Sequence, residues 1–165
     1  MMPVQVRTAV VVVVGLLFVL LVLLVLRWPP RRNEEKDEMS RALLRRATAL
    51  LTQGEGTDDP RIRRIRERWD FGITSFRRNS PEDPIAHSTD KQNVSLCLHE
   101  TDPNTAFFVL LHELAHIATP ERGHTPTFWD NFRVLLHLAT RKGLFVPLRR
   151  PSTMCGKPIK PFGPR

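Results

Sequence analysis

An unbroken apolar run and several periodic segments follow one another along this 165-residue chain. The run covers residues 9–26 and reads AVVVVVGLLFVLLVLLVL. As a helix it would be about 27 Å long, close to the roughly 30 Å hydrocarbon core of a bilayer. A cleaved signal peptide would have an apolar region of about 7–15 residues and a small-residue cleavage site. We therefore expect a short N-terminal head over 1–8 and an uncleaved transmembrane anchor over 9–26.

Helical periodicity returns in four later segments. Apolar residues recur every three or four positions in the first, second and fourth of them, which is typical of a helix with one buried face. The third is apolar almost all round and should be fully buried. It begins after Asp102, a good N-cap, with Pro103 at the first helical position, and it stops before Pro120. The expected helices are 40–51, 61–69, 103–118 and 125–141.

One segment alternates strictly and predicts a strand over 93–99, where apolar Val94, Leu96 and Leu98 interleave with more polar residues. This strand is either a plain core strand or an edge strand that pairs with an extended substrate. Residues 72–90 look irregular or weakly extended, and the proline-rich tail over 157–165 looks extended or disordered. Helices and a small sheet together predict an α+β fold.

Charge and cysteine content bear on location. Arg7 is the one basic residue before the apolar run, whereas the charged juxtamembrane linker over 27–39 is rich in Arg and Lys. The positive-inside rule then predicts a single-pass membrane protein whose catalytic domain is cytoplasmic. Cys97 and Cys155 form no disulfide framework, which fits a reducing compartment, although a single bridge between them stays open.

The net charge of +8 comes largely from arginines in two segments, 40–51 and 61–69. Such residues usually form a solvated helix face. The alternative is contact with anionic lipid or with nucleic acid. No basic stretch interleaved with aromatic residues supports the nucleic-acid alternative directly.

The buried helix carries the chemistry. Between residues 106 and 118 its only polar side chains are His112, Glu113 and His116. Burying these groups costs free energy unless they have partners. Two histidines four residues apart project from one helix face, and Glu113 is placed to reach a metal-bound water without ligating the metal. This H-E-x-x-H arrangement predicts a zinc ion held by His112 and His116, with Glu113 as general base.

A catalytic zinc site needs a third protein ligand. The candidates after the buried helix are Glu121, His124, Asp130 and His137. We favour His124, because Gly123 permits a tight turn before it and a helix start follows it. Glu121 comes too soon after the helix for the chain to have turned back.

The stretch from His112 to Trp129, HELAHIATPERGHTPTFW, resembles the WLM and SprT-like zinc metallopeptidases. It resembles still more closely small, membrane-anchored WLM-type proteins of large DNA viruses. The resemblance covers roughly residues 59–156. It implies a minimal zincin-like metalloprotease domain over 40–156, with an active-site helix, a small sheet with an edge strand, and flanking helices. It also implies that His112, His116 and His124 bind zinc and that Glu113 is catalytic.

Two features depart from that pattern. The spacing from His116 to His124 is longer than in typical WLM sites. The chain has no Tyr to stabilise the oxyanion of a tetrahedral intermediate, so Arg133, His137 or a backbone N–H is left for that role. The segment around Met154 is weakly similar to the methionine turn of some zinc sites, but a surface loop is the simpler interpretation.

Together these observations predict a membrane-anchored zinc endopeptidase that acts on a polypeptide substrate. One alternative is a catalytically inactive, zinc-stabilised module that binds anionic membrane, nucleic acid or a protein partner. Another is hydrolysis of some other amide or ester by the same residues.

Overall fold

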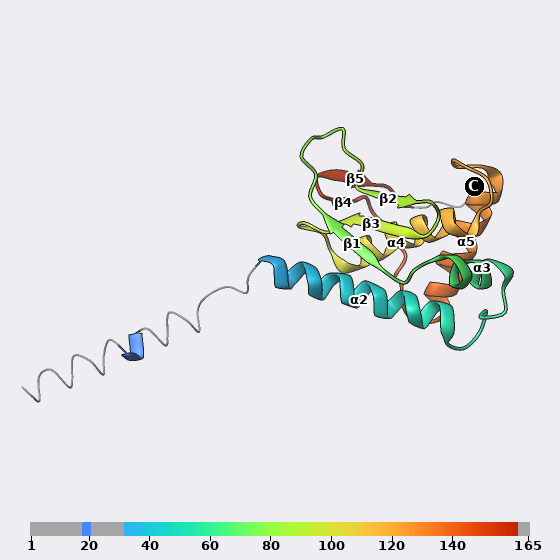
Figure 1. Ribbon diagram of the computed structural model, residues 1–165, viewed down its shortest axis with the longest axis horizontal. Helices are drawn as coiled ribbons and strands as arrows, with labels where there is room; N and C mark the ends of the chain where they lie inside the picture. The colour runs from blue at the N-terminus through green and yellow to red at the C-terminus, as the bar shows by residue number, and fades with distance from the viewer. Residues whose placement is uncertain (1–17, 21–31, 162–165) are drawn as a thin grey trace, which may run out of the picture. The chain divides into compact units, whose positions relative to one another are not determined.

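Helices α2 to α5 and five short strands make up the part of the chain that this computed structural model describes, residues 18–20 and 32–161 (Figure 1). The chain divides into two units, residues 1–34 and 35–165, and all of the strands and helices α3 to α5 belong to the second. The fold is α+β, as predicted. The elements are α2 (Arg32–Thr52), α3 (Pro60–Arg68), β1 (Ile73–Phe76), β2 (Ala86–Thr89), β3 (Asn93–Cys97), α4 (Pro103–Ala118), α5 (Pro126–Arg141), β4 (Ser152–Met154) and β5 (Lys157–Ile159).

The predicted transmembrane helix requires a correction. No helix within the described residues is both long and apolar enough to cross a membrane. Helix α2 has 21 residues but is rich in charge, and the apolar α4 has 16 residues, about 24 Å against a core of about 30 Å. Of the predicted anchor over 9–26, all but residues 18–20 lies outside the described part. The expectation of a single-pass membrane protein with a cytoplasmic catalytic domain is therefore not supported.

Helix α4 is the centre of the fold. The Asp102 side chain caps it by accepting hydrogen bonds from the backbone N–H groups of Asn104 and Thr105, which confirms the predicted start. The three-stranded sheet packs on one side of α4, and α3 and α5 pack on others. Nearly every apolar side chain of α4 is buried, and each such Leu or Phe contributes about 1.5–3 kcal/mol of burial free energy.

The sheet has the order β1-β3-β2, with β3 parallel to β1 and antiparallel to β2. The strand predicted from alternation is thus confirmed at Asn93–Cys97, as a central strand. The edge strand beside α4 is β2 instead. Both β1 and β2 lie within 72–90, which was expected to be irregular or weakly extended, and the two short strands agree with the extended alternative. These four-residue strands are half-exposed, and they are held by pairing with β3 rather than by apolar runs of their own.

A second hairpin, β4–β5, corrects the expectation of a surface loop around Met154, which is buried. Strand β5 lies at the start of the predicted tail over 157–165, which was expected to be extended or disordered, and agrees there with the extended alternative. The two-residue turn of the hairpin is Cys155-Gly156, both with positive φ, as a tight hairpin turn requires. Thr105 Oγ1 donates to Ser152 Oγ at 2.8 Å, so the hairpin contacts the first turn of α4. His112 lies about two turns further along the helix.

A disulfide joins Cys97 at the end of β3 to Cys155 in the hairpin turn. It settles the pairing that the sequence left open. Because disulfides persist in oxidising environments, this bond also counts against the expectation of a reducing compartment.

Removing this disulfide should destabilise the fold. The bond closes a loop with a sequence separation of 58 residues, which in the chain-entropy model is worth up to about 4 kcal/mol. We expect the double variant Cys97→Ser/Cys155→Ser to unfold at a clearly lower urea concentration than the oxidised protein. Reductant should lower the midpoint of the wild type and leave that of the double variant unchanged. Equal midpoints with and without reductant in the wild type would contradict the prediction.

Candidate metal centre

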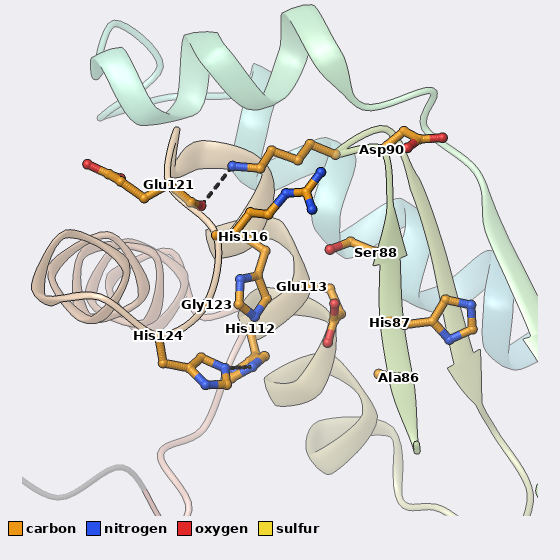
Figure 2. A pocket seen from close by; sticks show the side chains of 12 residues that line it. Ala86, His87, Ser88, Asp90, His112, Glu113, His116, Glu121, Gly123 and His124 are labelled. Atoms are coloured by element: carbon orange, nitrogen blue, oxygen red, sulfur yellow. Dashed lines mark hydrogen bonds between the residues drawn. The ribbon is translucent and has the colours of Figure 1, made fainter. Parts of the chain in front are cut away.

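Three imidazole rings converge at the predicted site (Figure 2). His112 and His116 come from one face of α4, and His124 comes from the loop between α4 and α5. One ring nitrogen from each of the three lies within 4.8 Å of the others, and Nε2 of His112 is 3.0 Å from Nε2 of His124. Nitrogen ligands at about 2.0–2.1 Å from a tetrahedral metal are separated by about 3.3 Å. The cluster is therefore compatible with a metal ion.

The loop between α4 and His124 turns back toward α4, and a glycine and hydrogen bonds from Lys91 hold its backbone in this conformation. Thr119 is the C-cap that follows α4, and Gly123 has a φ of +80°, a conformation that favours glycine. The Lys91 ammonium group, from the turn between β2 and β3, donates hydrogen bonds to the carbonyl oxygens of Thr119, Pro120 and Glu121. This contact fixes the loop that carries His124 against the sheet.

A buried polar network supports the same helix end from the other side. Asn131 on α5 donates to Thr119 Oγ1 at 2.9 Å, and Thr119 Oγ1 donates to the Ala115 carbonyl at 2.7 Å. Arg61 Nε on α3 donates to the Asn131 side-chain oxygen at 2.9 Å. Because a buried polar group costs free energy when unpaired, this network favours one relative placement of the three helices.

Aromatic side chains pack against all three histidines, of which His124 is exposed. The Phe128 ring lies 4.9, 4.3 and 4.7 Å from the rings of His112, His116 and His124, and Trp129 stacks on His124. Burial, with a smaller contribution from the neighbouring imidazoles, lowers the pKa of His112 to about 3. The same causes, together with Lys91, lower the pKa of His116 to about 4. Both imidazoles are therefore neutral at pH 7, the form that binds a metal.

Glu113 lies beside the histidines on the side of α4 that faces β2 (Figure 2). Its side chain is only 5% exposed. Burial raises the pKa of Glu113 to about 7, and a hydrogen bond with the Ser88 hydroxyl opposes that rise. A carboxyl group that titrates near neutral pH is suited to take up and release a proton there.

An open cleft of about 620 Å³ connects these groups with the edge of β2. The Cys97 N–H donates to the Ile85 carbonyl, and bonded pairs alternate in an antiparallel ladder. The N–H and C=O groups of Ala86 and Ser88 therefore point to the free edge. Their side chains are half-buried, whereas His87 is exposed and points away from the histidines in Figure 2.

The other predicted ligand candidates do not join the three histidines, although Glu121 lines the same cleft. Among the described residues, the metal-ligand cluster contains none of Glu121, Asp130 and His137. Asp130 pairs with Arg133 at 2.6 Å, and Arg133 and His137 line a separate groove of about 290 Å³. Neither of the two side chains predicted as oxyanion stabilisers therefore faces the cleft.

Sequence patterns did not indicate Ser88, Lys91 or Arg122, which also line the cleft. Lys91 reaches the helix end because Asp90 and Lys91 both adopt positive φ in the β2–β3 turn. Asp tolerates this conformation better than most residues, but Lys has no such preference. The sequence Asp90-Lys91 therefore did not predict a turn with two residues at positive φ.

The titration of these groups predicts how the metal-free protein responds to acid. Folding lowers the pKa values of His112 and His116, so below about pH 6.5 the unfolded chain binds more protons than the folded one. The free energy of unfolding therefore falls as the pH falls. Glu113 acts in the opposite sense, because its pKa is raised and the folded state gains its proton between about 7 and 4.5. Protonation of Glu113 thus partly offsets the loss of stability caused by the two histidines. We expect Glu113→Gln to remove this contribution, so that the free energy of unfolding falls more steeply from pH 7 to pH 4.5.

Urea unfolding in the presence of a chelator at several pH values measures this effect. His112→Asn should act in the opposite direction and flatten the loss of stability. Identical pH profiles for the wild type and both variants would contradict the assigned pKa shifts.

Comparison with known proteins finds two viral relatives. The chain is 36% identical over 76 residues to "Uncharacterized protein 042R" of Invertebrate iridescent virus 3, a match covering 42% of this chain and 47% of that protein. It is 35% identical over 72 residues to "Uncharacterized protein 136R" of Invertebrate iridescent virus 6, covering 39% and 40%. The matches thus span less than half the length of each relative. No protein-family model matches the chain, and no solved structure matches it significantly. The resemblance to WLM and SprT-like peptidases therefore stays a prediction.

Proposed function

We propose that this protein is a zinc-dependent endopeptidase. One observation carries the proposal: three histidine nitrogens within 4.8 Å of one another share a cleft with a buried glutamate and a free strand edge. Each part meets one requirement of metal-assisted peptide hydrolysis, namely metal ligands, a proton acceptor and a place for an extended chain.

The donor set suits zinc. Three imidazoles with no further ligand from the described residues match an open catalytic site better than a closed structural one. When bound there, zinc supplies a Lewis acid that acidifies water and polarises a carbonyl group. His112, His116 and His124 would hold it, and Phe128 and Trp129 restrict the orientations of their rings.

Glu113 is the proton carrier in this proposal. Its carboxylate takes a proton from the attacking water and later donates it to the leaving amine, so that Glu113 ends the cycle as it began. Without metal the pKa of Glu113 is about 7, and the positive charge of a bound zinc ion would lower it, so that the carboxyl group is ionised and able to accept a proton at neutral pH. Ser88 orients the carboxyl group through its hydroxyl and links the proton carrier to the edge strand.

The edge of β2 would bind the substrate backbone. A peptide added as an extra strand can exchange hydrogen bonds with Ala86 and Ser88, whose backbone groups point to the free edge. Main-chain pairing of this kind holds an extended polypeptide irrespective of most of its side chains. It therefore favours peptide hydrolysis over hydrolysis of a small amide or ester.

The direct test uses the full chain, stripped of metal and then reloaded with zinc, against a fluorescently labelled unfolded protein. We expect no cleavage in chelator and cleavage after zinc is restored. Stoichiometric zinc binding without any cleavage would reject the peptidase and favour a metal-stabilised binding module.

A further inference from the structure

Four basic residues gather at the end of the cleft where α4 ends. Lys91 and Arg122 line the cleft, and Arg64 Nε on α3 donates to the carbonyl oxygen of Ile117 at 3.4 Å. Burial, and then the positive charges of Arg64 and Arg68, lower the pKa of Lys91, with Arg122 adding to this. We call Arg64, Arg68, Lys91 and Arg122 the basic cluster.

The helix end accounts for only part of this charge. The C-terminus of a helix carries roughly half a negative charge, and two members of the cluster, Lys91 and Arg64, donate to carbonyl groups there. Within the described residues, no carboxylate forms an ion pair with any member of the cluster. The cluster thus retains positive charge beyond what the helix end offsets.

Two acidic residues also line this part of the cleft, Asp90 and Glu121. Figure 2 shows the side chains of both directed away from His116 and Glu113. Glu121 raises the pKa of Lys91, but by less than either Arg64 or Arg68 lowers it. The net field at this end of the cleft is therefore positive.

The direction of β2 relates the basic cluster to a bound peptide. The strand runs from Ala86 past Ser88, beside Glu113, to Thr89, and Lys91 lies in the turn that follows. A peptide paired antiparallel to it, the commoner arrangement, has its N-terminal part at the basic cluster. Lys91 follows Ser88 by three positions and lies in the turn after the strand, so the side chain that meets the cluster stands about two to four residues before the bond that is cleaved.

We propose that the basic cluster is a specificity subsite for acidic side chains located two to four residues N-terminal to the scissile bond. This inference rests on the proposed peptidase function. Arg side chains form charge-assisted hydrogen bonds with carboxylates, and Lys91, whose three donors bind the carbonyl oxygens of the loop after α4, adds positive charge. Because the subsite is open to solvent, its contribution should weaken as ionic strength rises.

Binding can be measured apart from catalysis in the full-length, zinc-loaded Glu113→Gln variant. The probes are fluorescent peptides of one sequence carrying Asp, Asn or Lys at the chosen positions. We expect the Asp peptide to bind about tenfold more tightly than the Lys peptide at low salt. Adding Arg122→Glu should remove this preference. The matched control is Arg63→Glu, which makes the same charge change at an exposed position of α3 and should keep it.

Cleavage of the neutral Asn peptide by the wild type tests the peptidase function separately. If no peptide is cleaved but Asp-selective binding persists and depends on Arg122, the peptidase proposal fails and the subsite stands. Equal binding of all peptides, a preference confined to the C-terminal side of the bond, or equal effects of the two arginine variants would overturn the subsite. So would a single-stranded oligonucleotide that binds through Arg122 while peptides show no selectivity.

Discussion

Replacing Glu113 with Gln is expected to lower the rate of peptide hydrolysis by about 10²–10⁴-fold, the range typical of a lost general base. Gln has nearly the same size and can still contact Ser88, but it cannot accept a proton from water at neutral pH. Because Glu113 is not among the clustered ligands, zinc stoichiometry should stay unchanged. The rate with saturating substrate should fall while the Michaelis constant changes little, because the edge strand still binds the peptide.

A matched control is Glu67→Gln, which removes a carboxylate from an exposed position on α3 and should leave the rate as it is. An active Glu113→Gln variant would reject Glu113 as the general base. Loss of zinc together with activity would instead show that Glu113 supports the metal site, and the kinetic result would then say nothing about proton transfer.

The elements that the sequence predicted well are those with local signals. Helices α3, α4 and α5 each begin after a capping side chain, Asp59, Asp102 or Thr125, and their predicted bounds agree within a residue or two. Helix α2 begins at Arg32, whereas we expected a helix from residue 40. The prediction missed the first turns because they are rich in charge and were assigned to a linker. Strand β3 was recognisable since its alternating side chains are buried on one face.

The rest of the fold depends on contacts that no local pattern reports. Strand β2 reads AHST and becomes a strand through its pairing with β3. The same holds for the site. Helical periodicity brought His112 and His116 together and a glycine turn indicated His124, whereas Ser88 and Lys91 reach the cleft through strand pairing and an unusual turn.

Replacing His124 with Ala should weaken zinc binding by at least about 100-fold, beyond the 10–100-fold typical of losing an outer-shell partner. His124 is the ligand from outside α4, so its loss leaves two imidazoles one turn apart. The matched control is His137→Ala on α5, an exposed histidine in the separate groove, which should bind zinc like the wild type. Elemental analysis and a competition assay with a chromophoric chelator measure both.

Thermodynamic linkage gives the same prediction a second readout. Zinc at 100 times its dissociation constant raises the free energy of unfolding by about 2.7 kcal/mol. We expect this gain in the wild type and in His137→Ala. A 100-fold weaker site in His124→Ala would gain only about 0.4 kcal/mol at the same zinc concentration. Full stabilisation of His124→Ala would exclude His124 as a ligand and, with it, the three-histidine site on which the proposed chemistry depends.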